Sequence, residues 1–278
     1  MLLTKPIDGK QLTTRAPAAF KSESTSTFGG SDIDEKCTYD AVNRCHARSM
    51  CRGGSRVEGD FTAHQLSPSS WNRYEECPRK YWLSRQRLPR KASMPAAMGT
   101  AVHNSVEDLC NLDLSDKDDS EIGWLPPTSK AVLDRHWALE RDIFLATPRH
   151  PRWKDEMITK AHDGIVGALN ILFSKSNMGK VGLSEVTVAQ WKQVQSIVLS
   201  NEGTLVSECG RLMGRLDLLV ADLDENGDSK GWIVADLKTG NPPKQKLNEK
   251  VSRQLRFYRD LLKEINPDHP PVYAEGWY

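Results

Sequence analysis

The fold is decided by residues 212–240, which read LMGRLDLLVADLDENGDSKGWIVADLKTG. Leu212–Val220 and Gly231–Asp236 are apolar runs typical of β-strands, and Asp224–Asp228 between them is typical of a hairpin turn. Each strand carries one acid of interest, Asp217 in the first and Asp236 in the second. Because the strands of a hairpin lie side by side, we expect these two carboxylates to be close enough to share a cation.

Lys238 follows Asp236 by two positions. Side chains alternate along a strand, so both residues should point to the same face. Two carboxylates, a backbone carbonyl and water are hard oxygen ligands that suit Mg²⁺ or Mn²⁺. A lysine at such a site can orient or deprotonate water and can offset the charge of a phosphorane-like transition state. The hairpin therefore has the groups that metal-dependent phosphodiester cleavage requires.

The segments around the hairpin add two strands and a helix. Thr204–Cys209 and Val272–Tyr278 are predicted strands, and Leu247–Ile265 is a predicted helix. Gln254 and Tyr258 lie one turn apart on this helix and can reach a metal site or a phosphate. The alternative is a buried tyrosine with an incidental glutamine. Because the chain ends on a strand, we expect it to be part of a longer protein.

The first part of the chain is predicted to be helical from about residue 66 to 176. Before it, residues 1–61 mix Ser, Thr, Gly and charge without apolar periodicity, and we expect them to be disordered. Ser67-Pro68 starts one helix, and another follows Gly99 with His103 near its start. Two amphipathic helices, 128–146 and 154–174, are expected to be scaffold. Residues 180–200 fit either a strand or a helix.

Two segments, 67–98 and 244–263, each contain seven Lys/Arg and two Asp/Glu. The first intersperses four aromatic residues with cations that include Arg73, Arg79 and Lys80, and the second contains Arg253. Aromatic and cationic side chains together suit a single-stranded nucleic acid, whose bases stack and whose phosphates pair. The alternative for the first segment is that the aromatic residues face the core and the cations are merely solvated.

Whole-chain totals narrow the class of protein. The 278 residues suffice for one elaborate domain or two modest ones, and the net charge of +1 predicts neither a nucleic-acid partner nor an acidic one. The six cysteines form no C-x-x-C pair and no signal peptide precedes them, which predicts reduced thiols in the cytoplasm. No apolar run is long enough to cross a bilayer, and no phosphate-binding loop of an ATP motor occurs.

Six sequence elements carry a resemblance through their order. They are Cys77-Pro78-Arg79-Lys80-Tyr81, Gly99-Thr100-Ala101-Val102-His103, Glu208, Gly214-Arg215-Leu216-Asp217, Val234-Ala235-Asp236-Leu237-Lys238-Thr239-Gly240 and Gln254-x-x-x-Tyr258. Over about residues 64–278 the chain resembles the RecB-type nuclease domain of the PD-(D/E)XK superfamily, a branch that includes CRISPR-associated exonucleases. The resemblance implies an α/β, restriction-endonuclease-like core at 62–278: a small mixed β-sheet flanked by helices, with a helical insertion. The catalytic sheet and helix would occupy about 203–278.

The resemblance also implies a role for each matching residue. The metal ligands would be His103, Asp217, Asp236 and the carbonyl of Leu237. Lys238 would be the catalytic lysine, and Gln254 with Tyr258 would contact the site or the nucleic acid. Glu208 matches an acid on the strand before the hairpin, with a structural or an outer-shell part.

An iron–sulfur cluster is not expected in this chain. Many relatives bind one through a cysteine at the place of Cys77 and three more beyond the last strand. Here no cysteine follows Cys209. The resemblance thus implies a Mg²⁺- or Mn²⁺-dependent DNA nuclease, an exonuclease of DNA repair, recombination or defence that acts on single strands or ends, with a helicase as a candidate partner. The alternative is a catalytically silent module of the same fold that binds DNA or a helicase partner.

Overall fold

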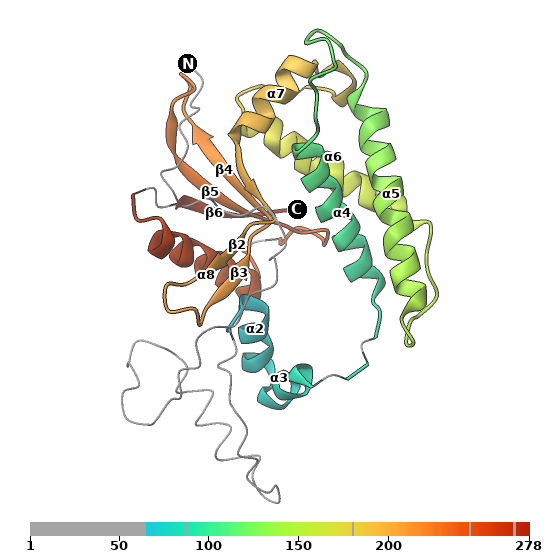
Figure 1. The fold of residues 1–278 in the computed structure, drawn as a ribbon, viewed down its shortest axis with the longest axis vertical. Helices are drawn as coiled ribbons and strands as arrows, with labels where there is room; N and C mark the ends of the chain where they lie inside the picture. Colours follow the sequence, from blue (N-terminus) through green and yellow to red (C-terminus); the bar gives the residue numbers. More distant parts are fainter. Residues whose placement is uncertain (1–64, 87, 90, 180, 245, 269–270) are drawn as a thin grey trace, which may run out of the picture.

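The computed structural model describes residues 65–278 except 87, 90, 180, 245, 269 and 270 (Figure 1). The predicted disorder of residues 1–61 therefore lies outside the described residues. Within them, none of the helices combines the length and the apolar character needed to cross a lipid bilayer.

A four-stranded mixed sheet forms the centre of the fold, in the order β1-β4-β5-β6. Its strands are β1 Val198–Asn201, β4 Leu218–Leu223, β5 Ser229–Leu237 and β6 Pro271–Trp277. The inner strand β4 is antiparallel to both β1 and β5, whereas β5 and β6 are parallel. A separate antiparallel pair consists of β2 Thr204–Val206 and β3 Met213–Arg215. This arrangement confirms the predicted α/β fold with a small mixed sheet.

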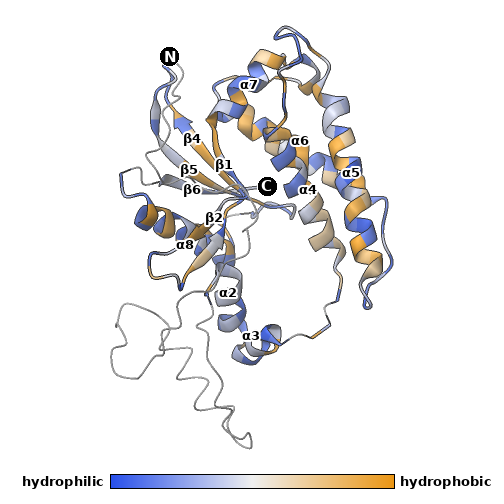
Figure 2. Cartoon of the chain, in the orientation of Figure 1, coloured by the Kyte–Doolittle hydropathy of each residue, from blue (hydrophilic) through white to orange (hydrophobic). Residues whose placement is uncertain are grey.

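Helices cover both faces of the sheet (Figure 1). The helices are α2 Pro68–Glu76, α3 Pro78–Arg85, α4 Met94–Cys110, α5 Leu125–Ala146, α6 Met157–Lys175, α7 Val188–Ile197 and α8 Glu249–Ile265, with a short 3₁₀ turn at Leu183–Glu185. On one face, Leu218 and Ala235 join the core formed by α4 to α7; on the other, Leu219 and Val234 pack under α8. Adjacent residues face opposite sides, and both sides are apolar, so the consecutive residues Leu218–Ala221 of β4 and Trp232–Ala235 of β5 are hydrophobic. Figure 2 colours the elements by hydropathy.

The predicted strand Leu212–Val220 is wrong as a continuous element. It divides into β3 and β4, which belong to different sheets, and Leu216 and Asp217 lie between them. Their backbone groups bond instead to the preceding turn: Leu216 N–H donates to Gly203 O at 2.9 Å and Glu202 N–H donates to Asp217 O at 2.8 Å. The chain therefore changes sheets at the acid that was predicted to bind metal.

The predicted first helix is also divided, into α2 and α3. Cys77 between them has an extended backbone, with φ −166° and ψ 113°, and Pro78 opens the second helix. Proline disfavours a helical conformation in the residue before it, which explains the break. Ser67 caps α2 as expected. Because α4 begins at Met94, His103 lies in the middle of its helix rather than near the start. Residues 180–200, left open by their sequence, contain both α7 and β1.

Candidate active site

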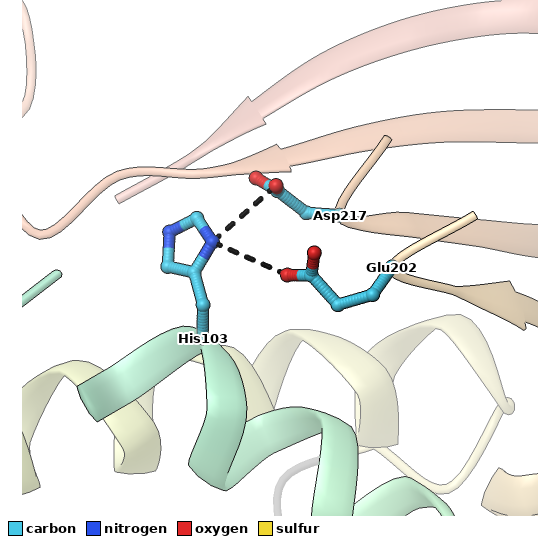
Figure 3. A group of neighbouring side chains, drawn as sticks. All are labelled: His103, Glu202 and Asp217. Atoms are coloured by element: carbon cyan, nitrogen blue, oxygen red, sulfur yellow. Dashed lines mark ion pairs between the residues drawn. The ribbon is translucent and has the colours of Figure 1, made fainter. Parts of the chain in front are cut away.

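Three ionisable side chains from three separate parts of the fold meet beside the sheet (Figure 3). His103 comes from α4, Glu202 from the turn between β1 and β2, and Asp217 from the junction of β3 and β4. The Nδ1 atom of His103 lies 3.3 Å from Asp217 Oδ1 and 3.7 Å from Glu202 Oε1. One ligand atom of each residue lies within 4.8 Å of the others, and the described residues contain no second group of this kind.

The surroundings of His103 favour a proton on both ring nitrogens. Its Nε2 lies 3.1 Å from the carbonyl oxygen of Leu237, which can only accept a hydrogen bond. Its Nδ1 faces the two carboxylates. Burial alone would lower the pKa of His103, but hydrogen bonds and negative charge from Asp217 and Glu202 outweigh burial and raise the pKa to about 10. The imidazolium therefore holds a positive charge among oxygen acceptors.

The end of β5 brings a third acid to this group. The N–H of Leu237 donates to Asp217 Oδ2 at 2.7 Å, while its carbonyl faces His103. The neighbouring residue Asp236 is fully buried. Its Oδ2 lies 2.5 Å from Lys238 Nζ in an ion pair, and among the described residues this ammonium is the group that faces the buried oxygen.

The pKa of Asp236 is raised to about 6. Burial is the main cause and the charge of Asp217 adds to it, whereas the charges of Lys238 and His103 act in the opposite direction. The protein thus keeps an acid in a place that disfavours its charged form, an arrangement typical of functional sites.

Helix α8 completes the site with an amide. Gln254 Nε2 donates to Asp236 Oδ1 at 2.8 Å and to the Tyr258 hydroxyl at 3.0 Å. The other end of the amide, Oε1, accepts from Lys238 Nζ at 3.5 Å. One amide therefore contacts both the acid and the lysine at the end of β5.

The family model of the PD-(D/E)XK nuclease superfamily matches residues 65–277. The chain belongs to this superfamily. Comparisons with curated proteins and with solved structures gave no match. In this PD-(D/E)XK protein, Asp236-Leu237-Lys238 has the (D/E)-X-K pattern of the superfamily's name.

The residues of this PD-(D/E)XK protein fit a divalent cation. The surroundings offer an imidazole, carboxylates and the Leu237 carbonyl, and hard oxygen donors of this kind suit Mg²⁺ or Mn²⁺. The imidazolium of His103 beside Asp217 and Glu202, and the ammonium of Lys238 beside Asp236, both show that the local acids attract positive charge. The fit does not distinguish one divalent metal from the other.

The structure brings together seven of the residues predicted to act at the site: His103, Asp217, Asp236, Leu237, Lys238, Gln254 and Tyr258. Glu208 does not lie at the site. It is exposed, and its backbone N–H donates to the side chain of Glu264 at 3.0 Å. The acid that does reach His103 is Glu202, which the sequence reasoning missed. An acid directly before a glycine in a turn could have indicated Glu202 as a site residue. The strand before that turn, β1, was not predicted, so the turn was not recognised.

Of the predicted nucleic-acid contacts, Arg73 lies on α2 and Arg79 and Lys80 lie on α3, and neither helix contributes a side chain to this group. Arg79 and Lys80 are exposed on α3, a helix with no buried residue, and Lys80 pairs with Glu76 at 2.8 Å. Arg73 donates to Ser84 at 3.1 Å. The aromatic residues of α3 therefore do not face a core.

Arg253 lies on α8 and connects this helix to the arm formed by α2 and α3. It donates to Asn72 Oδ1 at 2.9 Å, and its guanidinium lies 5.9 Å from the ring centroid of Trp71. Arg253 also directly precedes Gln254, so the arm adjoins the helix that reaches the acids.

Proposed function

We propose that this protein is a metal-dependent deoxyribonuclease that hydrolyses phosphodiester bonds with Mg²⁺ or Mn²⁺. The observation that carries the proposal is the pairing of Lys238 with Asp236 at 2.5 Å, directly beside the group formed by His103, Asp217 and Glu202. A lysine held against a buried acid at a cation site is the arrangement that phosphodiester hydrolysis needs.

The ligands would be His103, Asp217, Asp236 and the Leu237 carbonyl, with Glu202 as an additional acid. When bound, the cation supplies positive charge to phosphate oxygens and makes water more acidic. His103 has to release a proton to become a ligand, since a metal-binding imidazole is neutral at the ligating nitrogen.

The side chain of Lys238 is 27% exposed, so its ammonium is accessible to a substrate while it pairs with Asp236. It can hold the negative charge that develops on the phosphate, or exchange a proton with water. The ammonium also donates to Gln254 Oε1 at 3.5 Å.

The proposed substrate is DNA in single strands or at ends, and the proposed activity is that of a RecB-type exonuclease in repair, recombination or defence. The arm formed by α2 and α3 favours a single-stranded substrate. It exposes Arg79 and Lys80 together with Trp82, whose exposed fraction is 38%. Exposed cations and aromatic rings bind phosphates and stack bases without sequence preference. Free thiols at Cys77, Cys110 and Cys209 support a reducing compartment such as the cytoplasm.

The test is cleavage of end-labelled single-stranded, double-stranded and circular DNA, and of RNA, with Mg²⁺ or Mn²⁺. We expect Asp236→Ala and Lys238→Ala to abolish cleavage while the wild-type protein cuts. Matched controls on the same hairpin are Asp222→Ala and Lys230→Ala, since both residues lie outside the site. Both controls should retain wild-type rates.

Equal cleavage by wild type, Asp236→Ala and Lys238→Ala would overturn the proposal. Cleavage of circular DNA, which has no ends, would show that the activity is that of an endonuclease and not the proposed exonuclease. Binding of DNA, or of a helicase, without cleavage under either metal would support the catalytically silent module instead.

A further inference from the structure

Tyr258 packs directly on the backbone of Gly214. A Cβ atom added at Gly214 would lie 2.6 Å from Cε1 and 2.8 Å from Cδ1 of the Tyr258 ring, closer than carbon atoms approach. Gly214 does not have the left-handed backbone that favours glycine, so glycine is required here for space. Gly214 lies on β3, and Tyr258 on α8 is only 4% exposed. The contact therefore fixes the ring between the two elements.

The hydroxyl of this ring contacts the amide of Gln254. The amide nitrogen donates to Tyr258 at 3.0 Å and to Asp236 at 2.8 Å, and the amide oxygen lies 3.5 Å from Lys238 Nζ. Rotating the amide by 180° would place its nitrogen against the ammonium and its oxygen against the carboxylate. Asp236, which accepts, and Lys238, which donates, therefore select one orientation of the amide, and in that orientation its nitrogen also bonds to the Tyr258 hydroxyl.

We propose that Gly214 and Tyr258 are positioning residues: the tyrosine ring, seated on the glycine, holds the Gln254 amide, which in turn aligns Asp236 and Lys238 for cleavage. The proposal deepens the nuclease function given above and rests on it. The role assigned to Gly214 rests on its contact with the Tyr258 ring; Gly214 itself is not proposed to bind metal or substrate.

Direct contact of Tyr258 with substrate does not fit its surroundings. The side chain is 4% exposed, and its ring is enclosed by the small core under α8, which includes Leu205 and Leu262. Burial raises the pKa of Tyr258 well above its usual value, so the hydroxyl remains protonated. It can act only through the residue it contacts, Gln254.

The first test is Tyr258→Phe, which deletes one oxygen and keeps the ring on Gly214. We expect kcat for DNA cleavage to fall by about 10- to 100-fold, the usual effect of losing a residue that orients a ligand, with KM nearly unchanged. We also expect the side-chain amide protons of Gln254, identified by NMR through their loss in Gln254→Glu, to shift and to exchange faster with water. Tyr273→Phe is the matched control, because Tyr273 on β6 is 54% exposed.

The second test uses Gly214→Ala, which places a methyl group against the ring. We expect it to lower kcat and to shift the Gln254 amide signals as Tyr258→Phe does. Combined with Tyr258→Leu, which removes the ring edge, Gly214→Ala should cause no further loss beyond that of Tyr258→Leu alone. Gly167→Ala on α6 is the matched control, since a Cβ there meets only one atom, at 3.9 Å.

The outcomes separate this proposal from the nuclease function. If wild type cleaves DNA but Tyr258→Phe retains its kcat and its Gln254 signals, the positioning role is refuted and the nuclease stands. If wild type does not cleave, the nuclease is refuted, and the Gln254 signals still decide whether tyrosine and glycine orient the amide. Should Gly214→Ala fail to fold, Tyr258→Phe alone carries the test. Additive losses in the double variant would refute the part assigned to Gly214.

Discussion

Replacing Glu202 by glycine should separate stability from metal binding. Glu202 has a φ of 49°, in the left-handed region that L side chains rarely adopt. It is held there by the bond from its N–H to Asp217 O at 2.8 Å. Glutamate at such a position costs about 1–2 kcal/mol of backbone energy, which glycine avoids. The strained backbone at this acid motivates the test of whether the Glu202 carboxylate binds metal.

The opposing effects in Glu202→Gly nearly cancel. Glycine gains about 1–2 kcal/mol from relief of strain but loses about 0.5–1 kcal/mol because its unfolded chain is more flexible. The variant also loses two ion pairs. The one with Arg215 at 2.5 Å is worth about 0.2–1 kcal/mol, because the Arg215 side chain is 65% exposed. The one with His103 at 3.7 Å is replaced in part, because Asp217 still lies 3.3 Å from the same imidazole nitrogen. Without metal, the free energy of unfolding should stay within about 1 kcal/mol of wild type, a shift of no more than about 4 °C.

Metal binding should respond differently. Loss of one carboxylate of the cluster should weaken Mn²⁺ affinity at least tenfold, which is about 1.4 kcal/mol. In excess Mn²⁺ the stabilisation by metal then falls by the same amount. The assay is thermal unfolding with chelator and with excess Mn²⁺, together with calorimetric titration of Mn²⁺. Asn177→Gly is the control, because Asn177 also has a positive φ, 61°, and bonds to Asp224 rather than to the cluster.

Two results would refute the reasoning. If metal-free Glu202→Gly lost more than about 2 kcal/mol while its Mn²⁺ affinity stayed at the wild-type value, Glu202 would be a structural residue. If Asn177→Gly weakened Mn²⁺ binding as much as Glu202→Gly, the effect would come from the backbone and not from the carboxylate.

Three further predictions concern protons and the nucleic acid. His103 has a pKa of about 10 without metal, so Mn²⁺ binding at pH 7 should release about one proton and strengthen as pH rises, which titrations in buffers of different ionisation enthalpy will measure. The pKa of Asp236 is raised from its ordinary value of 3.8 to about 6 in the folded protein, so its charge destabilises the folded state increasingly as pH rises through that interval. Asp236→Asn should therefore unfold at a higher temperature than wild type at pH 8, with little gain at pH 4, and should lose cleavage. Arg79→Ala should reduce the salt dependence of single-strand binding by about 0.7 in the log–log slope, whereas Trp82→Ala should weaken binding with an unchanged slope. Lys160→Ala, at an exposed lysine of α6 outside the arm formed by α2 and α3, should change neither the slope nor the affinity. Fluorescence anisotropy over a salt series measures both.

The strand-end residues were predictable because their signals are local. Asp236 and Lys238 follow a continuous apolar run, and strand alternation alone places both side chains on one face. Their observed separation of 2.5 Å agrees with that prediction. Gln254 and Tyr258 were also recognisable, since helical spacing puts them one turn apart and their hydrogen bond of 3.0 Å uses that spacing.

The missed features depend on contacts between distant segments. Glu202 reaches His103 because the turn before β2 bonds back to Leu216 and Asp217, and no pattern within the turn shows this. The same bonds interrupt the predicted strand at Asp217. By contrast, the break at Cys77 had a local signal in Pro78, which the aromatic periodicity across it obscured.

Leu237 shows why part of a metal site can be absent from side-chain patterns. Its peptide group donates to Asp217 at 2.7 Å and presents its carbonyl to His103 at 3.1 Å, so it links the two predicted ligands that come from different elements. Its side chain is only 5% exposed and packs into the core shared with α4 to α7. Burial therefore determines which residue type is found at position 237, while the backbone makes the contacts to the site. A substitution such as Leu237→Ala would act on the site only by loosening this packing, on which the positions of the Leu237 peptide group and of its partners Asp217 and His103 depend.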